Sequence, residues 1–393
     1  MKVALAFSGG LDTTYCAIYL ARELGYDVHA VTVNTGGFNE SERNQLKKKA
    51  ISLGVKEYLL LDVTEDFYQK GIKYLLFGNV LKNNTYPLSV SAERVFQAVA
   101  VAEYANEIEA DAIAHGSTGA GNDQIRFDLV FQTLCQDKEI ITPIRDNQLS
   151  REEEIDFLKQ NGVNGDWEKA AYSVNQGLWG TSIGGKETLT SDQYLPEEAF
   201  PSQLQATGSQ TVTIGFKEGE PASLNGVKES PVEIIQRLNE QGSQYAIGRD
   251  IHVGDTIIGI KGRLGFEAPA ALMLIKAHHA LEKHVLSKTQ IRLKDQLAGC
   301  YGDMVHEGQY LDPSMRNLEA FLDSSQINVT GEVKVFMAPY RFYVEGITSL
   351  NDLMQPAFGQ YGETNNTWTG EDVKGFVKIL ANRGKILNAV HHD

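Results

Sequence analysis

The sequence predicts an α/β fold in which a parallel, doubly wound sheet comes first, an α+β domain follows and a helical tail ends the chain. The main observation is that short apolar runs, partly β-branched, alternate with helix-like patterns as far as about residue 160. Such alternation is typical of a parallel sheet with helices on both faces, and ligands of these sheets bind at the carboxyl ends of the strands.

The elements expected in the first domain can be read from apolar runs, caps and glycines. The strands are Val3–Phe7, Val28–Asn34, Tyr58–Asp62, Asp111–His115 and Ile140–Pro143. The helices are Thr13–Leu24, Glu40–Leu53, Glu65–Phe77 and Ala92–Ile108. The capping box Ser150-Arg151-Glu152-Glu153 opens a further helix, which Gly162 closes.

Beyond about Gly185 the pattern becomes a mixture of strands and helices, which predicts a second, α+β domain. Its expected elements are a hairpin of Thr211–Phe216 and Pro221–Val227, helices at Val232–Gln241 and Pro269–Leu286, and a strand pair of Val333–Phe336 and Tyr340–Gly346. Thr369-Gly370-Glu371-Asp372 then opens an amphipathic helix, with Val373, Phe376, Val377 and Leu380 at helical spacing. We therefore divide the chain into domains at 1–165 and 166–365 and a tail at 366–393, whose helix docks either on its own subunit or on a neighbour.

Composition limits the class of partner. The 393 residues suffice for two or three domains, and a net charge of −15 argues against a nucleic-acid partner, which would require a basic surface. Cys16, Cys135 and Cys300 are isolated, which indicates neither a paired-cysteine metal site nor a disulfide framework. The N-terminal apolar run is too short for a signal peptide and no stretch is long enough to span a membrane. We expect a cytoplasmic protein without a membrane partner.

The stretch Phe7-Ser8-Gly9-Gly10-Leu11-Asp12-Thr13-Thr14 joins the first strand to the first helix. Unpaired backbone N–H groups at the helix N-terminus, flexible glycines and two hydroxyl groups suit a phosphate. There is no G-x-x-x-x-G-K-[ST] and so no lysine aimed at the β- and γ-phosphates. Such a loop suits cleavage between the α- and β-phosphates with transfer of AMP, while a plain glycine turn is the simpler alternative.

A second glycine-rich stretch, His115-Gly116-Ser117-Thr118-Gly119-Ala120-Gly121-Asn122-Asp123-Gln124-Ile125-Arg126-Phe127, again joins a strand to a helix. It offers a hydroxyl, an amide, a carboxylate and a guanidinium group, which together could hold an amino acid by both charged ends. The alternative is a capped helix start with a surface arginine. Asn34-Thr35-Gly36-Gly37 ends the second strand at the same edge, where it could meet an adenine ring or form an ordinary turn.

These motifs resemble those of the argininosuccinate synthase family, within the N-type ATP pyrophosphatases. The first is F-S-G-G-L-D-T-T, and the second is similar to the family's H-G-x-T-G-K-G-N-D-Q-x-R-F. The resemblance covers most of the chain and continues through Tyr86 and Ser91, Tyr172-Ser173, Leu178–Ser182, Gly248-Arg249 and Gly259–Arg263. It implies an adenine nucleotide alpha hydrolase-like first domain, a synthetase domain and a homotetramer in which C-terminal tails reach neighbouring subunits.

The reaction that the resemblance implies joins citrulline to aspartate through a citrullyl-adenylate, with ATP converted to AMP and pyrophosphate, in arginine biosynthesis. It implies that Asp12, Asn122 and Arg126 act in catalysis and that Mg²⁺ is held mainly by ATP phosphates, without a dedicated metal site. The implied ATP-binding residues are Ala6, Phe7, Ser8, Gly9, Gly10, Leu11, Asp12, Thr13, Thr14, Val33 and Gly116. The implied aspartate-binding residues are Thr118, Asn122 and Asp123, and those for citrulline are Tyr86, Ser91, Asn122, Arg126, Ser173 and Ser182.

Several departures from the family pattern concern charged residues. Ala120 replaces a lysine, and Asn175 and Gln176 replace two carboxylates. An ungapped match places Gly254 and Phe266 where the family has a citrulline-binding Glu and Tyr. Loss of acidic groups is physically consistent with an acceptor that lacks an α-ammonium group, such as N-acetyl- or N-succinylcitrulline, with an acyl pocket at Gly254 and Phe266. Alternatively, Asp255 or another carboxylate replaces the lost acid and the substrate is ordinary citrulline.

Two other functions share the phosphate loop. A tRNA thiolation or amidation enzyme would need a basic face and, for sulfur chemistry, paired cysteines, and the sequence indicates neither. A non-catalytic sensor of adenine nucleotides would keep the loop but would have no reason to keep Thr118, Asn122, Asp123 and Arg126 together.

Overall fold

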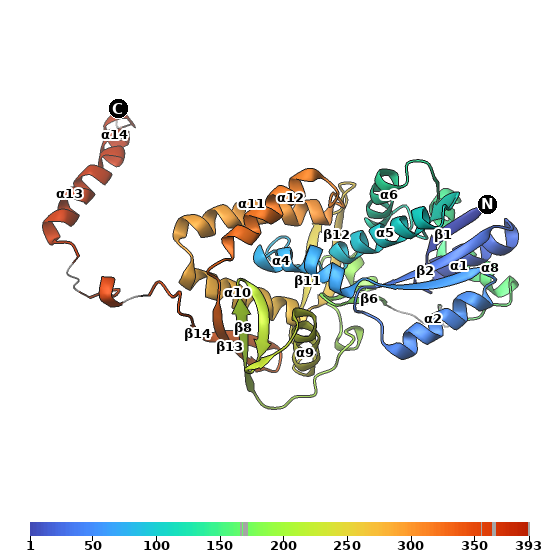
Figure 1. Cartoon of the computed structure of the whole chain (residues 1–393), viewed down its shortest axis with the longest axis horizontal. Helices are drawn as coiled ribbons and strands as arrows, with labels where there is room; N and C mark the ends of the chain where they lie inside the picture. Colours follow the sequence, from blue (N-terminus) through green and yellow to red (C-terminus); the bar gives the residue numbers. More distant parts are fainter. Residues whose placement is uncertain (166, 168–171, 355, 364–366, 392–393) are drawn as a thin grey trace.

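The computed structural model in Figure 1 has an elongated body of two lobes, from which the C-terminal segment projects as a separate arm. It describes residues 1–165, 167, 172–354, 356–363 and 367–391. The domain starts predicted at 166 and 366 lie outside the described residues.

The first lobe contains an all-parallel sheet in the order β3-β2-β1-β4-β5. Its strands are β1 (Lys2–Ala6), β2 (Asp27–Asn34), β3 (Glu57–Asp62), β4 (Ala112–Ala114) and β5 (Glu139–Ile141). The sequence predicted all five, with ends within two residues of those observed. Consecutive side chains of a strand point to opposite faces, and β1 accordingly sends Val3 and Leu5 into one apolar core and Ala4 into another.

Helices cover both faces of this sheet, as the predicted doubly wound fold requires. α1 (Leu11–Ile18), α2 (Glu40–Ser52) and α8 (Arg151–Gln160) contribute to the core that contains Val3 and Leu5, whereas α5 (Ser89–Glu107) and α6 (Asp123–Leu134) contribute to the core on the other face. The capping box predicted for α8 is present, since the Ser150 side chain accepts a hydrogen bond from the Glu153 backbone. The remaining helical segments are Tyr19–Glu23, α3 (Thr64–Phe67), Tyr68–Ile72, α4 (Lys73–Phe77) and α7 (Pro143–Asp146).

The second lobe has two antiparallel sheets. The predicted hairpin and strand pair join in one sheet, ordered β10-β9-β8-β13-β14. Its strands are β8 (Gln210–Lys217), β9 (Glu220–Leu224), β10 (Val227–Lys228), β13 (Gly331–Ala338) and β14 (Arg341–Thr348). The other sheet, β11-β12-β7-β6, was not predicted. It consists of β6 (Ser173–Gly177), β7 (Gly180–Gly184), β11 (Arg249–Asp255) and β12 (Lys261–Glu267).

The helices of this lobe correct one expectation and add two helices that were not predicted. α9 (Pro231–Gln244) does not end at Gly242, because that glycine serves close packing: a Cβ there would lie 2.5 Å from Cβ of Pro269 in α10 (Pro269–Val285). α11 (Lys288–His306) and α12 (Pro313–Ser325) were missed. Short 3₁₀ turns lie at Lys186–Leu189, Glu197–Ala199 and Pro356–Phe358.

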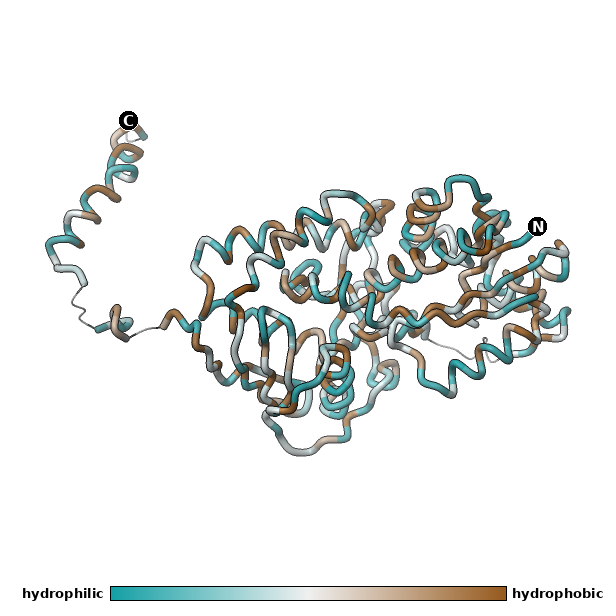
Figure 2. Tube along the Cα trace, viewed as in Figure 1, coloured by the Kyte–Doolittle hydropathy of each residue, from teal (hydrophilic) through white to brown (hydrophobic). Residues whose placement is uncertain are grey.

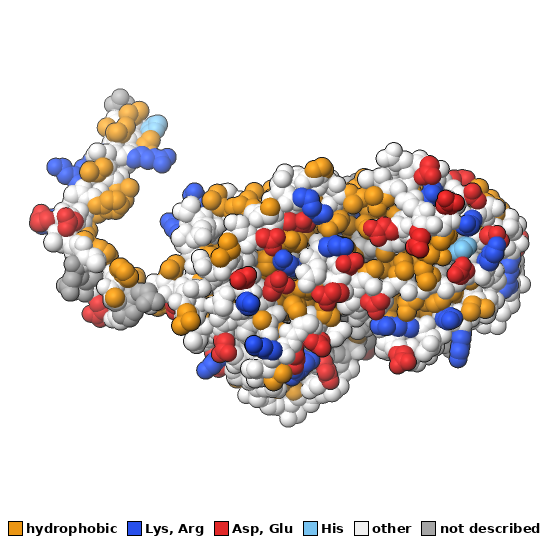
Figure 3. Space-filling view, viewed as in Figure 1, with side chains coloured by type: hydrophobic (Ala, Val, Ile, Leu, Met, Phe, Trp, Pro, Cys, Tyr) orange, Lys and Arg blue, Asp and Glu red, His pale blue; other side chains and the backbone are white. Residues whose placement is uncertain are grey.

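The arm contains α13 (Gly370–Leu380) and α14 (Asn382–His391). The predicted cap is present, because the Thr369 side chain accepts a hydrogen bond from the backbone of Asp372. Neither helix has a buried residue, and apolar segments of both stand free of the body (Figures 2 and 3). Among the described residues, no helix is both long and apolar enough to cross a membrane.

Candidate active site

A cavity of about 960 Å³ lies at the carboxyl ends of the parallel strands and extends to β6, β7, β11 and β12 of the second lobe. Both glycine-rich stretches line it. They lie against each other, since a Cβ at Gly116 would come within 3.2 Å of backbone atoms of Asp12 and Thr13. The parallel sheet therefore brings the two motifs to one rim, as the strand order requires.

Most of the predicted site residues line this cavity: Ala6, Phe7, Ser8, Gly10, Leu11, Asp12, Thr13, Val33, Tyr86, Ser91, Gly116, Thr118, Asn122, Asp123, Arg126, Ser173, Ser182 and Gly254. Gly9 and Thr14 do not line it, and both shape the loop instead. Gly9 has a φ of +74°, where an added Cβ would overlap the Leu46 side chain. The buried Thr14 hydroxyl donates to the Gly10 carbonyl over 2.6 Å.

The hydroxyl groups of the phosphate loop are held within the loop. The Ser8 and Thr13 hydroxyl oxygens lie 3.1 Å apart, and the backbone N–H of Gly10 points to the Ser8 oxygen over 3.4 Å. Lys49 of α2 donates to the Gly9 carbonyl over 2.6 Å. The loop thus has a defined shape before any anion reaches the helix N-terminus.

Asp12 is the carboxylate of this loop, and its neighbour Glu154 of α8 was missed by the sequence analysis. Burial raises the pKa of Asp12, and burial together with the charge of Asp12 raises the pKa of Glu154 to about 8. The two side chains are hydrogen-bonded, so at neutral pH they share a proton. Within the described part of the chain, no three His, Cys, Asp or Glu side chains form a metal-binding group. The Asp12 carboxylate, which lines the cavity at the phosphate loop, would suit an ion that also binds phosphate oxygens.

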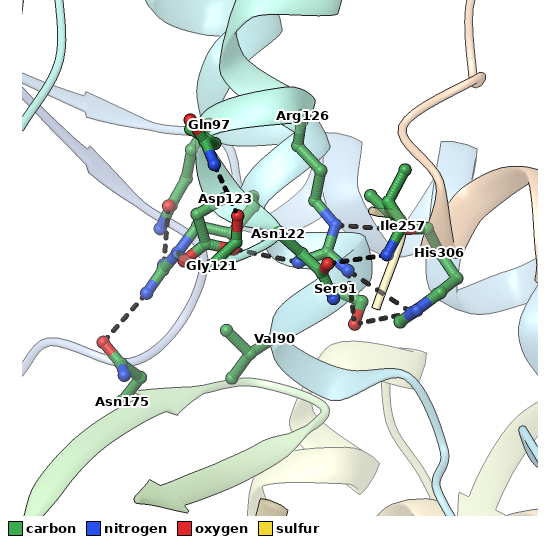
Figure 4. A network of polar contacts seen from close by, with 12 residues as sticks. Val90, Ser91, Gln97, Gly121, Asn122, Asp123, Arg126, Asn175, Ile257 and His306 are labelled. Atoms are coloured by element: carbon green, nitrogen blue, oxygen red, sulfur yellow. Dashed lines mark hydrogen bonds and ion pairs between the residues drawn. The ribbon is translucent and has the colours of Figure 1, made fainter. Parts of the chain in front are cut away.

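Arg126 is the centre of a buried network at the other end of the cavity (Figure 4). Its Nε donates to the backbone carbonyl of His306 over 2.9 Å, and its Nη1 donates to Asp123 over 2.8 Å. Its Nη2 lies 3.2 Å from the Ser91 hydroxyl and 3.3 Å from Nδ1 of His306. The guanidinium group therefore ties together α5, α6 and the last turn of α11.

Asp123 lies between two arginines. Arg94 of α5 donates to it over 3.1 Å, in addition to the contact from Arg126. Burial alone would raise the pKa of Asp123, but the two guanidinium groups outweigh it and lower the pKa. Arg94 also donates to the Asn175 side-chain oxygen over 2.8 Å (Figure 4), so the amide that replaces a family carboxylate remains a hydrogen-bond acceptor.

The cavity-lining residues that the sequence analysis missed include Glu93, His252 and His306, in addition to Arg94. Burial raises the pKa of Glu93 to about 7, and Thr35 donates a hydrogen bond to its carboxylate. One sequence signal was available: Glu93 lies in the predicted helix Ala92–Ile108, two residues after Ser91 and directly before Arg94. His252 lies two residues from Gly254 on the same face of β11, but this strand was not predicted.

The expected acyl pocket is not formed as predicted. The space beside Gly254 is occupied by His252, since a Cβ at Gly254 would lie 2.6 Å from its Nε2. Phe266 is fully buried, with its ring 5.5 Å from that of Tyr86, and it does not line the cavity.

Asn122 also lines the cavity, but its side-chain oxygen already has a partner. It accepts a hydrogen bond from the backbone N–H of Ile257 over 2.9 Å.

The fold and the site define an ATP-using α/β enzyme with a phosphate loop beside a pocket lined by charged side chains. Family models described as the arginosuccinate synthase N-terminal HUP domain and C-terminal domain match residues 2–164 and 172–387. The chain belongs to the argininosuccinate synthase family of ATP-dependent ligases.

Curated relatives agree with this assignment. The argininosuccinate synthase of Methanocaldococcus jannaschii is 37% identical and covers 88% of this chain and 91% of its own length. The argininosuccinate synthases of Dictyoglomus thermophilum and Xanthomonas campestris are also 37% identical to this chain, and each match covers 96% of it. The matches cover 95% of the Dictyoglomus protein and 96% of the Xanthomonas protein.

Proposed function

We propose that this chain joins a citrulline-type ureido acceptor to aspartate in arginine biosynthesis, within the ATP-dependent ligase activity of its family. The ureido oxygen attacks the α-phosphorus of ATP, and the bond to pyrophosphate breaks. The aspartate amine then attacks the ureido carbon, and the bond to AMP breaks with net release of one proton. The observation that carries the proposal is the shared cavity of phosphate loop and Arg126 network.

The phosphate loop would bind ATP through backbone N–H groups at the start of α1. The proposed ATP-binding set is Ala6 to Thr14 with Val33 and Gly116, of which Gly9 and Thr14 act through the shape of the loop. Mg²⁺ would bind phosphate oxygens and the Asp12 carboxylate and would neutralise phosphate charge. No covalent enzyme intermediate is needed, because the two substrates supply the nucleophiles, and catalysis rests on positioning and charge stabilisation.

The far end of the cavity would bind the amino acids. We assign aspartate to Thr118, Asn122 and Asp123, and the acceptor to Tyr86, Ser91, Asn122, Arg126, Ser173 and Ser182. All of these line the cavity. The buried guanidinium of Arg126 supplies the positive charge that a substrate carboxylate requires.

Pyrophosphate release tests the reaction most directly. The purified chain should sustain pyrophosphate release from ATP only when aspartate and a ureido acceptor are both present, and AMP should then form in equal amount. The acceptor without aspartate should give at most one pyrophosphate per active site. A nucleotide sensor would bind ATP without release. Isotope transfer from the ureido oxygen to AMP would establish the adenylate.

We also propose a homotetramer in which the arm 366–393 docks on a neighbouring subunit. Phe376 and Ile379 in α13 and Ile386 and Val390 in α14 are each more than 60% exposed, which is unusual for such side chains unless a partner covers them. Deletion of 366–393 should lower the mass seen in analytical ultracentrifugation and leave the body folded, because neither α13 nor α14 has a buried residue. An unchanged mass would exclude this role.

We also propose that the protein is cytoplasmic. The proposed domains are residues 1–165 and 166–365, followed by the arm 366–393.

A further inference from the structure

The acceptor end of the cavity is rich in hydrogen-bond donors. Arg126, His252 and His306 line it beside the hydroxyl groups of Tyr86 and Ser91. Arg126, His252 and His306 are each at least nine-tenths buried. Of these groups only the Arg126 guanidinium can do nothing but donate, so the role of each histidine depends on its tautomer.

The tautomer of His306 follows from its partners. Nδ1 lies 3.3 Å from Nη2 of Arg126, which can only donate, so Nδ1 accepts and carries no proton. Burial and the nearby charge of Arg126 lower the pKa of His306 to about 3, so the ring is neutral. Its proton is therefore on Nε2, which is buried and has no partner within the described structure. A buried donor of this kind requires an acceptor oxygen and cannot be satisfied by an ammonium group.

His252 adds a second unpaired nitrogen. Its Nδ1 is buried without a hydrogen-bond partner among the described residues, and its ring lies 5.3 Å from that of Tyr86. Burial and the charge of Lys82 lower the pKa of His252, so this ring is also neutral at pH 7. The α-carboxylate of an amino acid can accept from Arg126, but the α-nitrogen still needs a partner.

Within the described part of the chain, this end has no carboxylate that is both buried and unpaired. The acidic side chains that line it are Asp123, which two arginines hold, and Asp255, which is exposed and lies 2.6 Å from the ammonium of Lys261. Glu93 also lines the cavity, but it is two residues from Ser91 on α5 and so about 200° around the helix. It contacts Thr35 at the end of β2 instead.

We infer that the acceptor is an N-acylated citrulline, whose acyl oxygen accepts the hydrogen bond of His306 Nε2. Acylation removes the ammonium charge from a region where two arginines, Arg94 and Arg126, share one counter-ion, Asp123, and it adds the acceptor that His306 Nε2 lacks. The inference rests on the proposed function and concerns only the α-nitrogen of the acceptor. An acetyl group and a succinyl group share this amide chemistry, and the succinyl group adds a carboxylate.

The first test compares acceptors in the pyrophosphate assay with ATP and aspartate. Citrulline, N-acetylcitrulline and N-succinylcitrulline serve as the three acceptors. We expect kcat/KM for an acylated form to exceed that for citrulline by about 100-fold or more, as when buried donors are left unpaired by the wrong substrate. A larger value for succinyl than for acetyl would identify a terminal carboxylate as part of the ligand. Preference for free citrulline overturns this inference alone, and no release with any acceptor overturns the proposed function as well.

The second test attempts to reverse the preference. His252→Ala with Gly254→Glu removes the ring that fills the space beside Gly254 and places a carboxylate there for an α-ammonium group. We expect citrulline turnover to rise about tenfold and acylcitrulline turnover to fall about tenfold, with the KM for ATP unchanged. The matched control, His252→Ala with Gly254→Gln, has the same shape without the charge and should not gain citrulline turnover. Equal gains in both variants would count against the inference.

Discussion

The two ends of the cavity are built in different ways. The phosphate end is formed mainly by one continuous stretch of chain, and its shape is set by the backbone. Gly9 adopts a left-handed conformation, and Gly116 packs on the Asp12 backbone. The acceptor end is assembled from side chains of separate elements, with Ser91 from α5, Arg126 from α6, His252 from β11 and His306 from α11. A backbone site tolerates few substitutions, whereas a site of converging side chains can change its ligand through one or two of them.

The largest effect is expected at the acceptor end. Arg126→Ala removes the group that joins Asp123, Ser91 and His306, and it leaves a buried carboxylate with one arginine instead of two. We expect kcat/KM for the acceptor to fall about 10³-fold, since a buried charge aimed at the substrate is lost. Steady-state pyrophosphate release measures this.

Arg316→Ala provides the control for a lost arginine. Arg316 pairs with Glu319 on α12, outside the cavity, and is half exposed. The Arg316→Ala variant should keep a kcat/KM for the acceptor within about twofold of the parent value, because an exposed ion pair contributes little. If Arg126→Ala also changed kcat/KM by no more than about twofold, the hydrogen-bond network around Arg126 would have a structural role and no role in binding the acceptor.

The next effect separates the two amino-acid substrates. Asp123→Ala removes the carboxylate that Arg94 and Arg126 share, so the KM for aspartate should rise about 100-fold, because truncation leaves the charged partners unpaired. The KM for ATP should rise much less, because the phosphate loop is unchanged. Substrate titrations of initial rate give both constants. Equal rises would argue against assigning Asp123 to aspartate.

The same contrast explains what the sequence could predict. The five parallel strands and both glycine-rich turns were predicted because each is a local pattern, and the strand order then brings the turns together. His306 was missed because it lies 180 residues from Arg126 in a helix that was not recognised. The buried face of α11 includes Lys294, Ala298 and Gly302, so its apolar periodicity is weak. Lys294 is buried among its partners: its ammonium lies 3.1 Å from Glu282 of α10 and donates to the Phe77 carbonyl over 3.2 Å.

A smaller effect is expected at the phosphate end. Gly9→Ala forces a β-carbon into a left-handed conformation and against the Leu46 side chain. The conformational part costs about 1–2 kcal/mol. Displacement of Leu46 shifts the loop, so we expect the KM for ATP to rise about tenfold, which corresponds to about 1.4 kcal/mol.

Gly162 provides a matched control for Gly9. Its φ is also +74°, but a Cβ there would meet nothing within 4 Å. Gly162→Ala should therefore lower stability by a similar amount and leave the KM for ATP unchanged. Similar KM values for the two variants would show that the loop does not depend on this glycine.

The smallest effect concerns Glu93, which lies between the two ends. Its pKa of about 7 in the folded protein is above the value of about 4.5 expected in the unfolded chain. The folded state therefore binds the proton more tightly between these values, and the free energy of unfolding falls as pH rises from 4.5 to 7, by about 3 kcal/mol. Above pH 7 this loss is complete, because the carboxylate is ionised in both states.

Glu93→Gln removes this titration and keeps an oxygen that can accept the Thr35 hydroxyl. The variant should match the parent in stability near pH 4.5 and exceed it near pH 8, as measured by urea unfolding at each pH. The difference between the two proteins isolates Glu93 from the Asp12–Glu154 pair, which titrates in both. A difference that stayed constant from pH 4.5 to 8 would mean that Glu93 is not held in its neutral form. The cavity would then contain a further negative charge between its two ends.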